Sequence, residues 1–147
     1  TDFNLFFHKT GFLKSLGSVV NFKMKQKLFF VLIQPPFKCS TKNIYSKVNN
    51  YSKKTTFIRK KIVKKKEFLN FLSQSRNDLQ SVVEKKYPKI ERILNNISIQ
   101  KGCCFSRMTG SGSVCYGLFI DQNSAKKALN KLKYKYPKFW VSFAKTV

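Results

Sequence analysis

The 147-residue chain is poor in acidic residues, with 6 Asp and Glu against 30 Lys and Arg, and its formal net charge is +24. No apolar run approaches the roughly 20 residues that a membrane-spanning helix requires. The single histidine is His8, so Ser–His or Cys–His catalysis would have to use that residue. We therefore expect neither a membrane partner nor a histidine-dependent hydrolase.

The cysteines lack the paired C-x-x-C spacing of a zinc site. An adjacent pair, Cys103 and Cys104, stands apart from two single residues, Cys39 and Cys115. We therefore expect reduced thiols in a cytoplasmic protein and no protein-bound metal. Residues 1–7 also lack the basic start and the small-residue cleavage site of a signal peptide.

The positive charge consists of 26 Lys and only 4 Arg, beside 11 Asn, 15 Phe and 9 Ile but 3 Ala. Lys, Asn, Phe and Ile have A/T-rich codons, so an AT-rich genome would impose this composition on any surface. Proteins that read nucleic acids favour Arg, whose guanidinium makes paired hydrogen bonds. We interpret most lysines as a solvated surface that binds polyanions only nonspecifically. The alternative is a nucleic-acid-binding domain with phosphate contacts from Lys60, Lys61, Lys64, Lys65 and Lys66.

The first half of the chain begins with a strand and a short helix. Its 28–33 run is apolar throughout and stops before two prolines, which predicts a buried strand. Ser40 or Thr41 is suited to begin a short helix after that strand. Residues 49–66 are polar and basic, which is typical of a loop or a poorly ordered insert.

Helical spacing dominates the middle of the chain. Residues 68–72 predict a short helical segment, and Asn77 or Asp78 is suited to cap the next helix. Pro88 then predicts the first residue of a further helix. The apolar face of that helix consists of Ile90, Ile93, Leu94 and Ile97.

The last third returns to strands. Residues 103–108 and 114–120 predict two strands, a helix capped by Asn123 or Ser124 follows, and residues 139–143 predict the final strand. The order is strand, helices, strand, strand, helix, strand. This order predicts an α+β fold, a ferredoxin-like split β-α-β sandwich with an antiparallel sheet and helices on one face.

A small-residue segment joins the second and third strands of this plan. Two glycines separated by one residue allow consecutive backbone N–H groups to converge on an anion. The segment lacks the G-K-[ST] of a Walker A loop, and a plain hairpin turn is the simpler interpretation. Its residues are Thr109, Gly110, Ser111, Gly112 and Ser113.

Four ordered segments resemble a known family. They are the strand 29–33 with the prolines and the Ser-Thr pair after it, Asn77-Asp78-Leu79, the run 106–113 that reads Ser-Arg-Met-Thr-Gly-Ser-Gly-Ser, and the ending 140–146. The third of these resembles the third GHMP motif, R-[ML]-T-G-[ST]-G-[AS]. Over about 27–147, the chain resembles the C-terminal part of the 4-diphosphocytidyl-2-C-methyl-D-erythritol kinases of the GHMP kinase superfamily.

The resemblance implies an ATP- and Mg²⁺-dependent kinase on the non-mevalonate route to isoprenoid (terpenoid) precursors. Its substrate would be the 2-hydroxyl of a cytidyl-diphospho sugar alcohol, 4-diphosphocytidyl-2-C-methyl-D-erythritol. It also implies that residues 110–113 line the phosphate-transfer cleft and that Thr109 braces their loop. Asn77 and Asp78 would cap their helix and hold it near that cleft.

Parts of the family pattern are missing from this chain. The Gly- and Ser-rich ATP loop, the N-terminal Lys and the Asp that activates the substrate hydroxyl have no counterpart here. We therefore expect residues 1–26 to be the end of an N-terminal kinase domain with its linker, and residues 27–147 to be the C-terminal domain. Such a chain would carry no catalytic residue and would be inactive without its N-terminal partner. A ferredoxin-like regulatory domain that binds a small anion is a further alternative.

Overall fold

The computed structural model describes residues 11–13, 19–21, 27–49, 51–52 and 65–146. Most of the insert predicted at 49–66 lies outside these residues, as do Lys60, Lys61 and Lys64. Helix α2 begins at Lys65, so the C-terminal end of the predicted insert is wrong. Residues 65 and 66 form the first turn of that helix, because lysine is a good helix former and its charge can stay at the surface.

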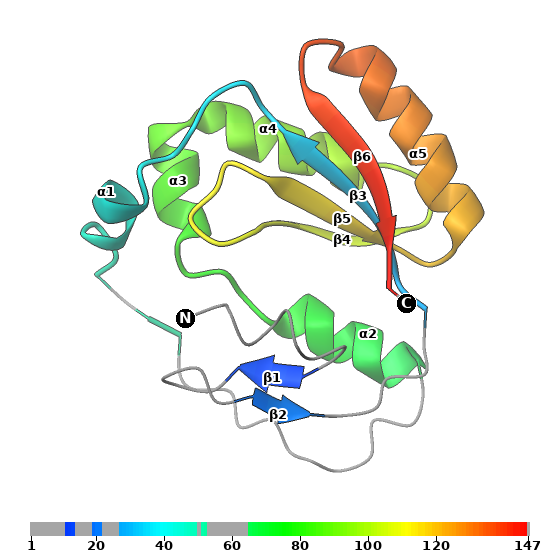
Figure 1. The fold of residues 1–147 in the computed structure, drawn as a ribbon, viewed down its shortest axis with the longest axis horizontal. Coiled ribbons are helices and arrows are strands. Elements are labelled where there is room, and N and C mark those ends of the chain that lie inside the picture. The colour runs from blue at the N-terminus through cyan, green and yellow to red at the C-terminus, as the bar shows by residue number, and fades with distance from the viewer. Residues whose placement is uncertain (1–10, 14–18, 22–26, 50, 53–64, 147) are drawn as a thin grey trace.

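A four-stranded antiparallel sheet is the centre of the fold, as Figure 1 shows. The strand order is β4-β5-β3-β6, so the first strand of the unit, β3, lies between the third and the fourth. Val31 of β3 is opposite Gly117 of β5 on one side and Phe143 of β6 on the other. This is the ferredoxin-like order that the sequence predicts. The strands are β3 (Phe29–Gln34), β4 (Cys103–Met108), β5 (Cys115–Phe119) and β6 (Trp140–Lys145).

Two further strands pair outside this sheet. They are β1 (Gly11–Leu13) and β2 (Val19–Asn21), which form a two-stranded antiparallel sheet of their own. They belong to the segment that the sequence assigns to the end of a preceding domain. That domain boundary remains a prediction.

One face of the central sheet carries the main helices and the main core. Ile93 and Ile97 of α4 pack with Val31, Ile33 and other apolar side chains of the strands in one buried cluster. This confirms the apolar face that the sequence predicts for the helix beginning at Pro88. The helices are α1 (Thr41–Tyr45), α2 (Lys65–Gln74), α3 (Gln80–Lys86), α4 (Pro88–Ser98) and α5 (Gln122–Lys135).

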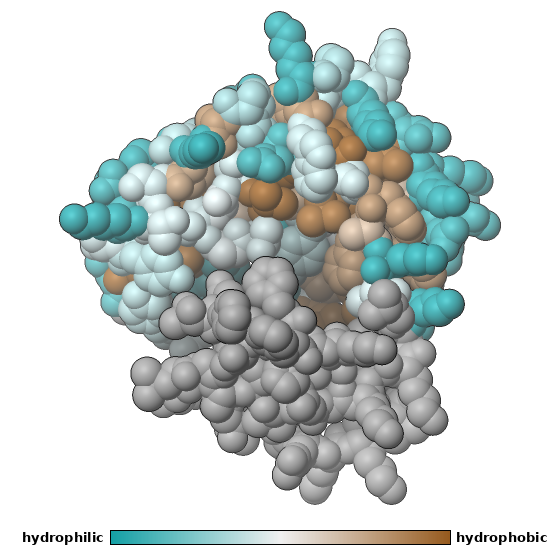
Figure 2. Space-filling model, viewed as in Figure 1, coloured by the Kyte–Doolittle hydropathy of each residue, from teal (hydrophilic) through white to brown (hydrophobic). Residues whose placement is uncertain are grey.

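Helix α2 lies on the other face of the sheet. Its buried Phe68 packs with Leu28 and Leu118, and Phe30 lies against the same cluster. Side chains alternate between the two faces of a strand, so β3 sends Phe30 to this face and Val31 to the main core. The apolar run of β3 thus serves two cores. Figure 2 shows apolar side chains gathered over the strands and hydrophilic ones around them.

Two predicted helix caps are wrong by a few residues. The N-cap of α5 is Asp121, whose carboxylate accepts from Ser124 N at 2.8 Å, and not Asn123 or Ser124. The chain passes from β5 into α5 within two residues, so the cap lies closer to the strand than expected. Helix α3 begins at Gln80 with Leu79 as its N-cap residue, which places Asn77 outside the helix.

Candidate functional site

The segment 109–113 is a tight turn between β4 and β5. The N–H of Gly112 donates to the carbonyl of Thr109 at 3.1 Å, and the N–H of Thr109 donates to the carbonyl of Val114 at 2.9 Å. Both glycines have positive φ, 53° at Gly110 and 86° at Gly112, which favours glycine at each position. A Cβ at Gly112 would also lie 2.8 Å from Met108 Sδ. The turn therefore depends on its glycines.

Two backbone N–H groups of the turn are available to a ligand. The carbonyl of Thr109 points into the turn, so the N–H of Gly110 in the same trans peptide points outward. Within the described part of the chain, neither this N–H nor that of Ser111 donates to another group. Adjacent free N–H groups suit an anion such as a phosphate oxygen.

The serine hydroxyls of the turn hold it to the rest of the domain. Ser113 is buried, and its hydroxyl donates to the carbonyl of Phe37 at 2.6 Å. The hydroxyls of Ser111 and Thr41 lie 2.9 Å apart. These contacts connect the turn to α1 and to the segment before it. The Ser113 hydroxyl is thus engaged inside the protein.

Asn77 reaches the turn from the segment just before α3. Its Nδ2 donates to the carbonyls of Met108 and Gly110, each at 2.8 Å, and its Oδ1 accepts from Leu79 N at 3.1 Å. Asp78 faces elsewhere. Its carboxylate accepts from the N–H of Ser52 at 2.9 Å and from the Ser52 hydroxyl, and these hydrogen bonds lower the pKa of the carboxyl. The structure brings Asn77 and residues 109–113 together, and Asp78 contacts residue 52 instead.

Two adjoining cavities of about 430 Å³ each are lined in part by Asn77, and one of them borders the turn. The first, which we call the Tyr45 cavity, contains Thr109 and Gly110 in its wall together with the side chains of Tyr45, Tyr51 and Tyr116. Tyr45 and Tyr51 are exposed, so their rings are accessible to a ligand. The cavity thus places aromatic rings beside the start of the turn.

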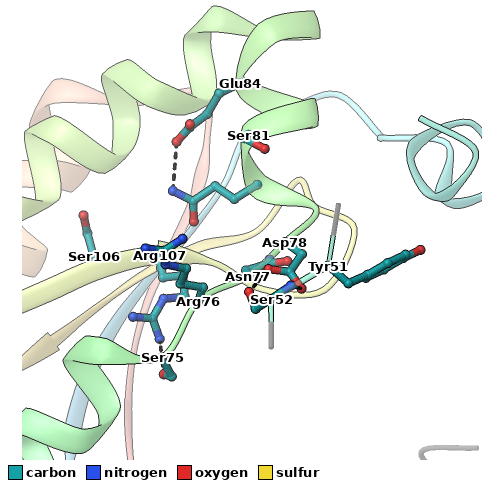
Figure 3. A pocket seen from close by; sticks show the side chains of 11 residues that line it. Tyr51, Ser52, Ser75, Arg76, Asn77, Asp78, Ser81, Glu84, Ser106 and Arg107 are labelled. Carbon is teal, nitrogen blue, oxygen red and sulfur yellow. Dashed lines mark hydrogen bonds between the residues drawn. The ribbon is translucent and has the colours of Figure 1, made fainter. Parts of the chain in front are cut away.

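The second cavity, which we call the Ser81 cavity, extends along α3, as Figure 3 shows. Arg107 lines both cavities, but its guanidinium donates to Ser75 Oγ at 2.9 Å and to the carbonyl of Leu72 at 3.1 Å. Arg107 therefore fixes the end of α2 to β4. The exposed Arg76, which also lines both cavities, is a cation available for a ligand.

The sequence did not assign a role to the tyrosines of the Tyr45 cavity or to Arg76 and Arg107. Tyr45 stands in the predicted short helix, and Tyr51 in the predicted insert. Arg107 belongs to the glycine motif, and its position two residues after Phe105 on β4 indicates a side chain on the α2 face. This two-residue spacing is the sequence feature that could have placed Arg107 near α2.

Of the five lysines that the nucleic-acid alternative invokes, Lys65 and Lys66 belong to the described residues. Lys65 donates from Nζ to the carbonyl of Ile120 at 3.0 Å, and Lys66 lies in the same helix, α2. Lys60, Lys61 and Lys64 lie outside the described residues.

Magnesium does not fit the side chains that line the two cavities. Asp78 and Glu84 are their carboxylates, and Glu84 accepts from Gln80 Nε2 at 2.8 Å while Asp78 is bound to Ser52. Among the described residues, no three His, Cys, Asp or Glu side chains come together in a way that could hold a metal. The turn with its free N–H groups fits the phosphates of ATP.

None of the described helices is long and apolar enough to cross a membrane.

Two of the most similar curated proteins carry the same name. The 4-diphosphocytidyl-2-C-methyl-D-erythritol kinase of Pelagibacter ubique is 36% identical over 135 residues, which are 92% of this chain and 47% of the relative. That of Anaplasma phagocytophilum is 33% identical over 135 residues, which are 90% of this chain and 45% of the relative. The chain spans about half the length of the curated relatives it matches.

Solved structures show the same fold. A crystal structure of 4-(cytidine 5'-diphospho)-2C-methyl-D-erythritol kinase superposes with a TM-score of 0.65 at 17% identity, over 85% of this chain and 45% of that one. A homoserine kinase from Cytophaga hutchinsonii superposes with a TM-score of 0.57 at 13% identity, over 89% of this chain and 45% of that one. Nothing in these matches supports the nucleic-acid alternative.

The family model described as GHMP kinases C terminal matches residues 57–138, which is more than half of the chain. The match includes α2, α3, α4, β4, the turn, β5 and α5. The chain belongs to the GHMP kinase C-terminal family.

Proposed function

We propose that this chain supplies the C-terminal half of an ATP-dependent kinase that phosphorylates the 2-hydroxyl of 4-diphosphocytidyl-2-C-methyl-D-erythritol. The reaction would belong to the synthesis of isoprenoid precursors. The relatives from Pelagibacter ubique and Anaplasma phagocytophilum carry the name of that kinase, and their similarity extends over nine-tenths of this chain.

The observation that carries the proposal is the pair of N–H groups at Gly110 and Ser111, which donate to no other described group, in a turn that borders an aromatic cavity. Phosphoryl transfer depends on positioning the phosphates and stabilising their charge. The two N–H groups would bind phosphate oxygens, and Thr109, Gly112 and Ser113 would hold the turn in shape. ATP would supply the transferred phosphoryl group when bound.

The Tyr45 cavity suits the nucleotide part of the substrate. A cytidyl diphosphate has a flat base and two charged phosphates, and the cavity offers the exposed rings of Tyr45 and Tyr51 and the cation of Arg76. Aromatic rings stack on bases, and a guanidinium binds phosphate. The net charge of +24 would attract both polyphosphate substrates.

An N-terminal kinase domain completes the proposed enzyme. It would provide the catalytic base, the ATP loop and any Mg²⁺ ligands, since the described residues of this chain offer no metal cluster. The four cysteines are free thiols, which fits a cytoplasmic location where thiols stay reduced.

Complementation tests this proposal. The full chain is mixed with a separately produced N-terminal half of the Pelagibacter ubique kinase, and ADP release is measured with 4-diphosphocytidyl-2-C-methyl-D-erythritol and ATP. We expect turnover from the mixture that neither part shows alone. If the two parts form a complex and the mixture binds ATP without transferring phosphate to this substrate, the proposal is wrong.

A further inference from the structure

Strand β4 is an edge strand, and side chains from the start of α3 pair with its outer side near the turn. In the sheet order β4-β5-β3-β6, β4 has one strand neighbour, so the other side of its backbone needs different partners. Met108 N donates to Gln80 Oε1 at 3.0 Å, and Met108 O accepts from Asn77 Nδ2 at 2.8 Å. Two amide side chains thus continue the hydrogen bonding of the strand where a fifth strand would lie.

Asn77 extends this pairing beyond the strand into the glycine turn. The same Nδ2 group donates to the carbonyl of Gly110 at 2.8 Å. In a trans peptide the C=O and N–H point in opposite directions, so this bond turns the N–H of Ser111 away from Asn77. Gly110 has positive φ and open space around a would-be Cβ, so no side-chain packing at Gly110 itself fixes the direction of that peptide.

We propose that Asn77 is a positioning residue that orients the Ser111 N–H toward a bound phosphate. Its amide is fixed at its other end, where Oδ1 accepts from Leu79 N at 3.1 Å. The start of α3 therefore sets the direction of the peptide that joins Gly110 to Ser111. The inference rests on the proposed function in taking phosphate as the ligand, and it deepens that function by naming the residue that prepares the site.

The substitution Asn77→Asp separates positioning from folding. Aspartate keeps the shape and the acceptor for Leu79 N, but it places an anionic oxygen against the carbonyls of Met108 and Gly110. Repulsion would turn the peptide over and remove the Ser111 N–H from the phosphate side. The matched control is Asn96→Asp, which makes the same charge change at a residue that contacts Tyr136 and Lys135 between α4 and α5.

The experiment is an NMR titration of the ¹⁵N-labelled full chain with inorganic triphosphate at constant ionic strength. In the wild type, the amide signals of Gly110 and Ser111 should shift and saturate. In Asn77→Asp the affinity at these amides should fall at least about tenfold, since two hydrogen bonds become repulsive contacts. Asn96→Asp should titrate like the wild type.

A second variant covers the case in which Asn77→Asp does not fold. Asn77→Ala removes the two donated hydrogen bonds without adding charge, and the affinity should fall about three- to tenfold. A residue that only stabilises the fold would lower the unfolding midpoint and leave the Ser111 response unchanged, which would overturn the inference. Unresponsive Gly110 and Ser111 amides in the wild type would also overturn it. An inactive complementation mixture together with an Asn77-dependent Ser111 response would reject the proposed substrate and retain this inference.

Discussion

Individual residues define the distances at which the elements of this domain meet. Gly117 is the clearest case, since a Cβ at that position would lie 2.3 Å from Ile97 Cγ2 of α4. Because Gly117 has no side chain, α4 can pack closely against β5, the strand that follows the turn. The register of α4 on the sheet, and the position of the turn beyond it, therefore depend on one small residue.

Gly117→Ala should lower the free energy of unfolding by about 1–3 kcal/mol, because the added methyl group overpacks the core. Urea unfolding followed by circular dichroism measures the change. The matched control is Gly110→Ala, where no atom lies within 4 Å of the new Cβ and the cost comes from the positive φ alone. That cost should be about 1–2 kcal/mol. Unchanged stability in Gly117→Ala would contradict the close packing of α4 on β5.

The four thiols should differ in reactivity. Burial raises the pKa of Cys103 to about 11 and that of Cys115 to about 12, and burial also raises the pKa of Cys104 and Cys39. A β-bulge at Cys104 turns that residue toward solvent.

We therefore expect iodoacetamide to label Cys104 first and Cys115 last in the native chain at a mildly alkaline pH. Mass spectrometry of peptides from timed samples measures the order. All four thiols should react at similar rates in urea, which serves as the control. Early labelling of Cys115 would show that its surroundings are open.

At the scale of elements, the helices bury more apolar side chains on one face of the sheet than on the other. Helix α4 contributes four buried apolar side chains to the main core, whereas α2 contributes Phe68 to the smaller one. The stability of the domain should therefore depend more on α4 than on α2.

Replacement of the buried Ile93 by Ala should lower the free energy of unfolding by about 2–5 kcal/mol. Ile99, just after the same helix, is 75% exposed. Ile99→Ala should therefore change the free energy of unfolding by less than about 0.5 kcal/mol. Urea unfolding of both variants makes the comparison. Equal effects would contradict the orientation of α4.

The link between Ser52 and Asp78 should make stability depend on pH. Hydrogen bonds from Ser52 lower the pKa of Asp78, so the folded state favours the ionised carboxyl. The contribution is complete above the pKa of the unfolded chain, about 3.9, and is lost as the pH falls through the folded value. The wild type should be more stable than Asp78→Asn at pH 6, and the difference should shrink below about pH 4.

Thermal unfolding of both proteins at several pH values tests this dependence. Both proteins contain the same other acidic groups, including Asp121. The loss of stability that these groups cause at low pH is therefore the same in both and cancels in the difference. A difference that grows as the pH falls would have the wrong sign for a lowered pKa.

The sequence predicts most elements of this fold, and the reasons can be seen in particular residues. Periodic apolar positions locate α4, and an unbroken apolar run locates β3, because burial imposes both patterns locally. The position of α2 on the second face and the reach of Asn77 to Gly110 were not predictable in this way. Both depend on contacts between residues more than 30 positions apart, and no local pattern records them. The glycine turn was predicted as a turn, but the engagement of the Ser113 hydroxyl with Phe37 emerged only from the fold.

At the scale of the whole molecule, the chain belongs to the GHMP kinase C-terminal family, and its candidate phosphate-binding groups lie on one side. The turn, the segment that leads into α3 and the Tyr45 cavity adjoin one another, and Figure 1 shows α5 away from the turn. The proposed enzyme needs a second domain on the side of the turn, and the relatives are about twice as long as this chain.

The most direct test of the kinase proposal is a single-chain chimera, in which this chain replaces the C-terminal half of the Pelagibacter ubique kinase. The measurement is ³¹P NMR of 4-diphosphocytidyl-2-C-methyl-D-erythritol incubated with ATP and the purified chimera. We predict a new phosphomonoester signal on the 2-hydroxyl, together with stoichiometric ADP. A folded chimera that binds ATP and this substrate and yields no phosphomonoester would contradict the account.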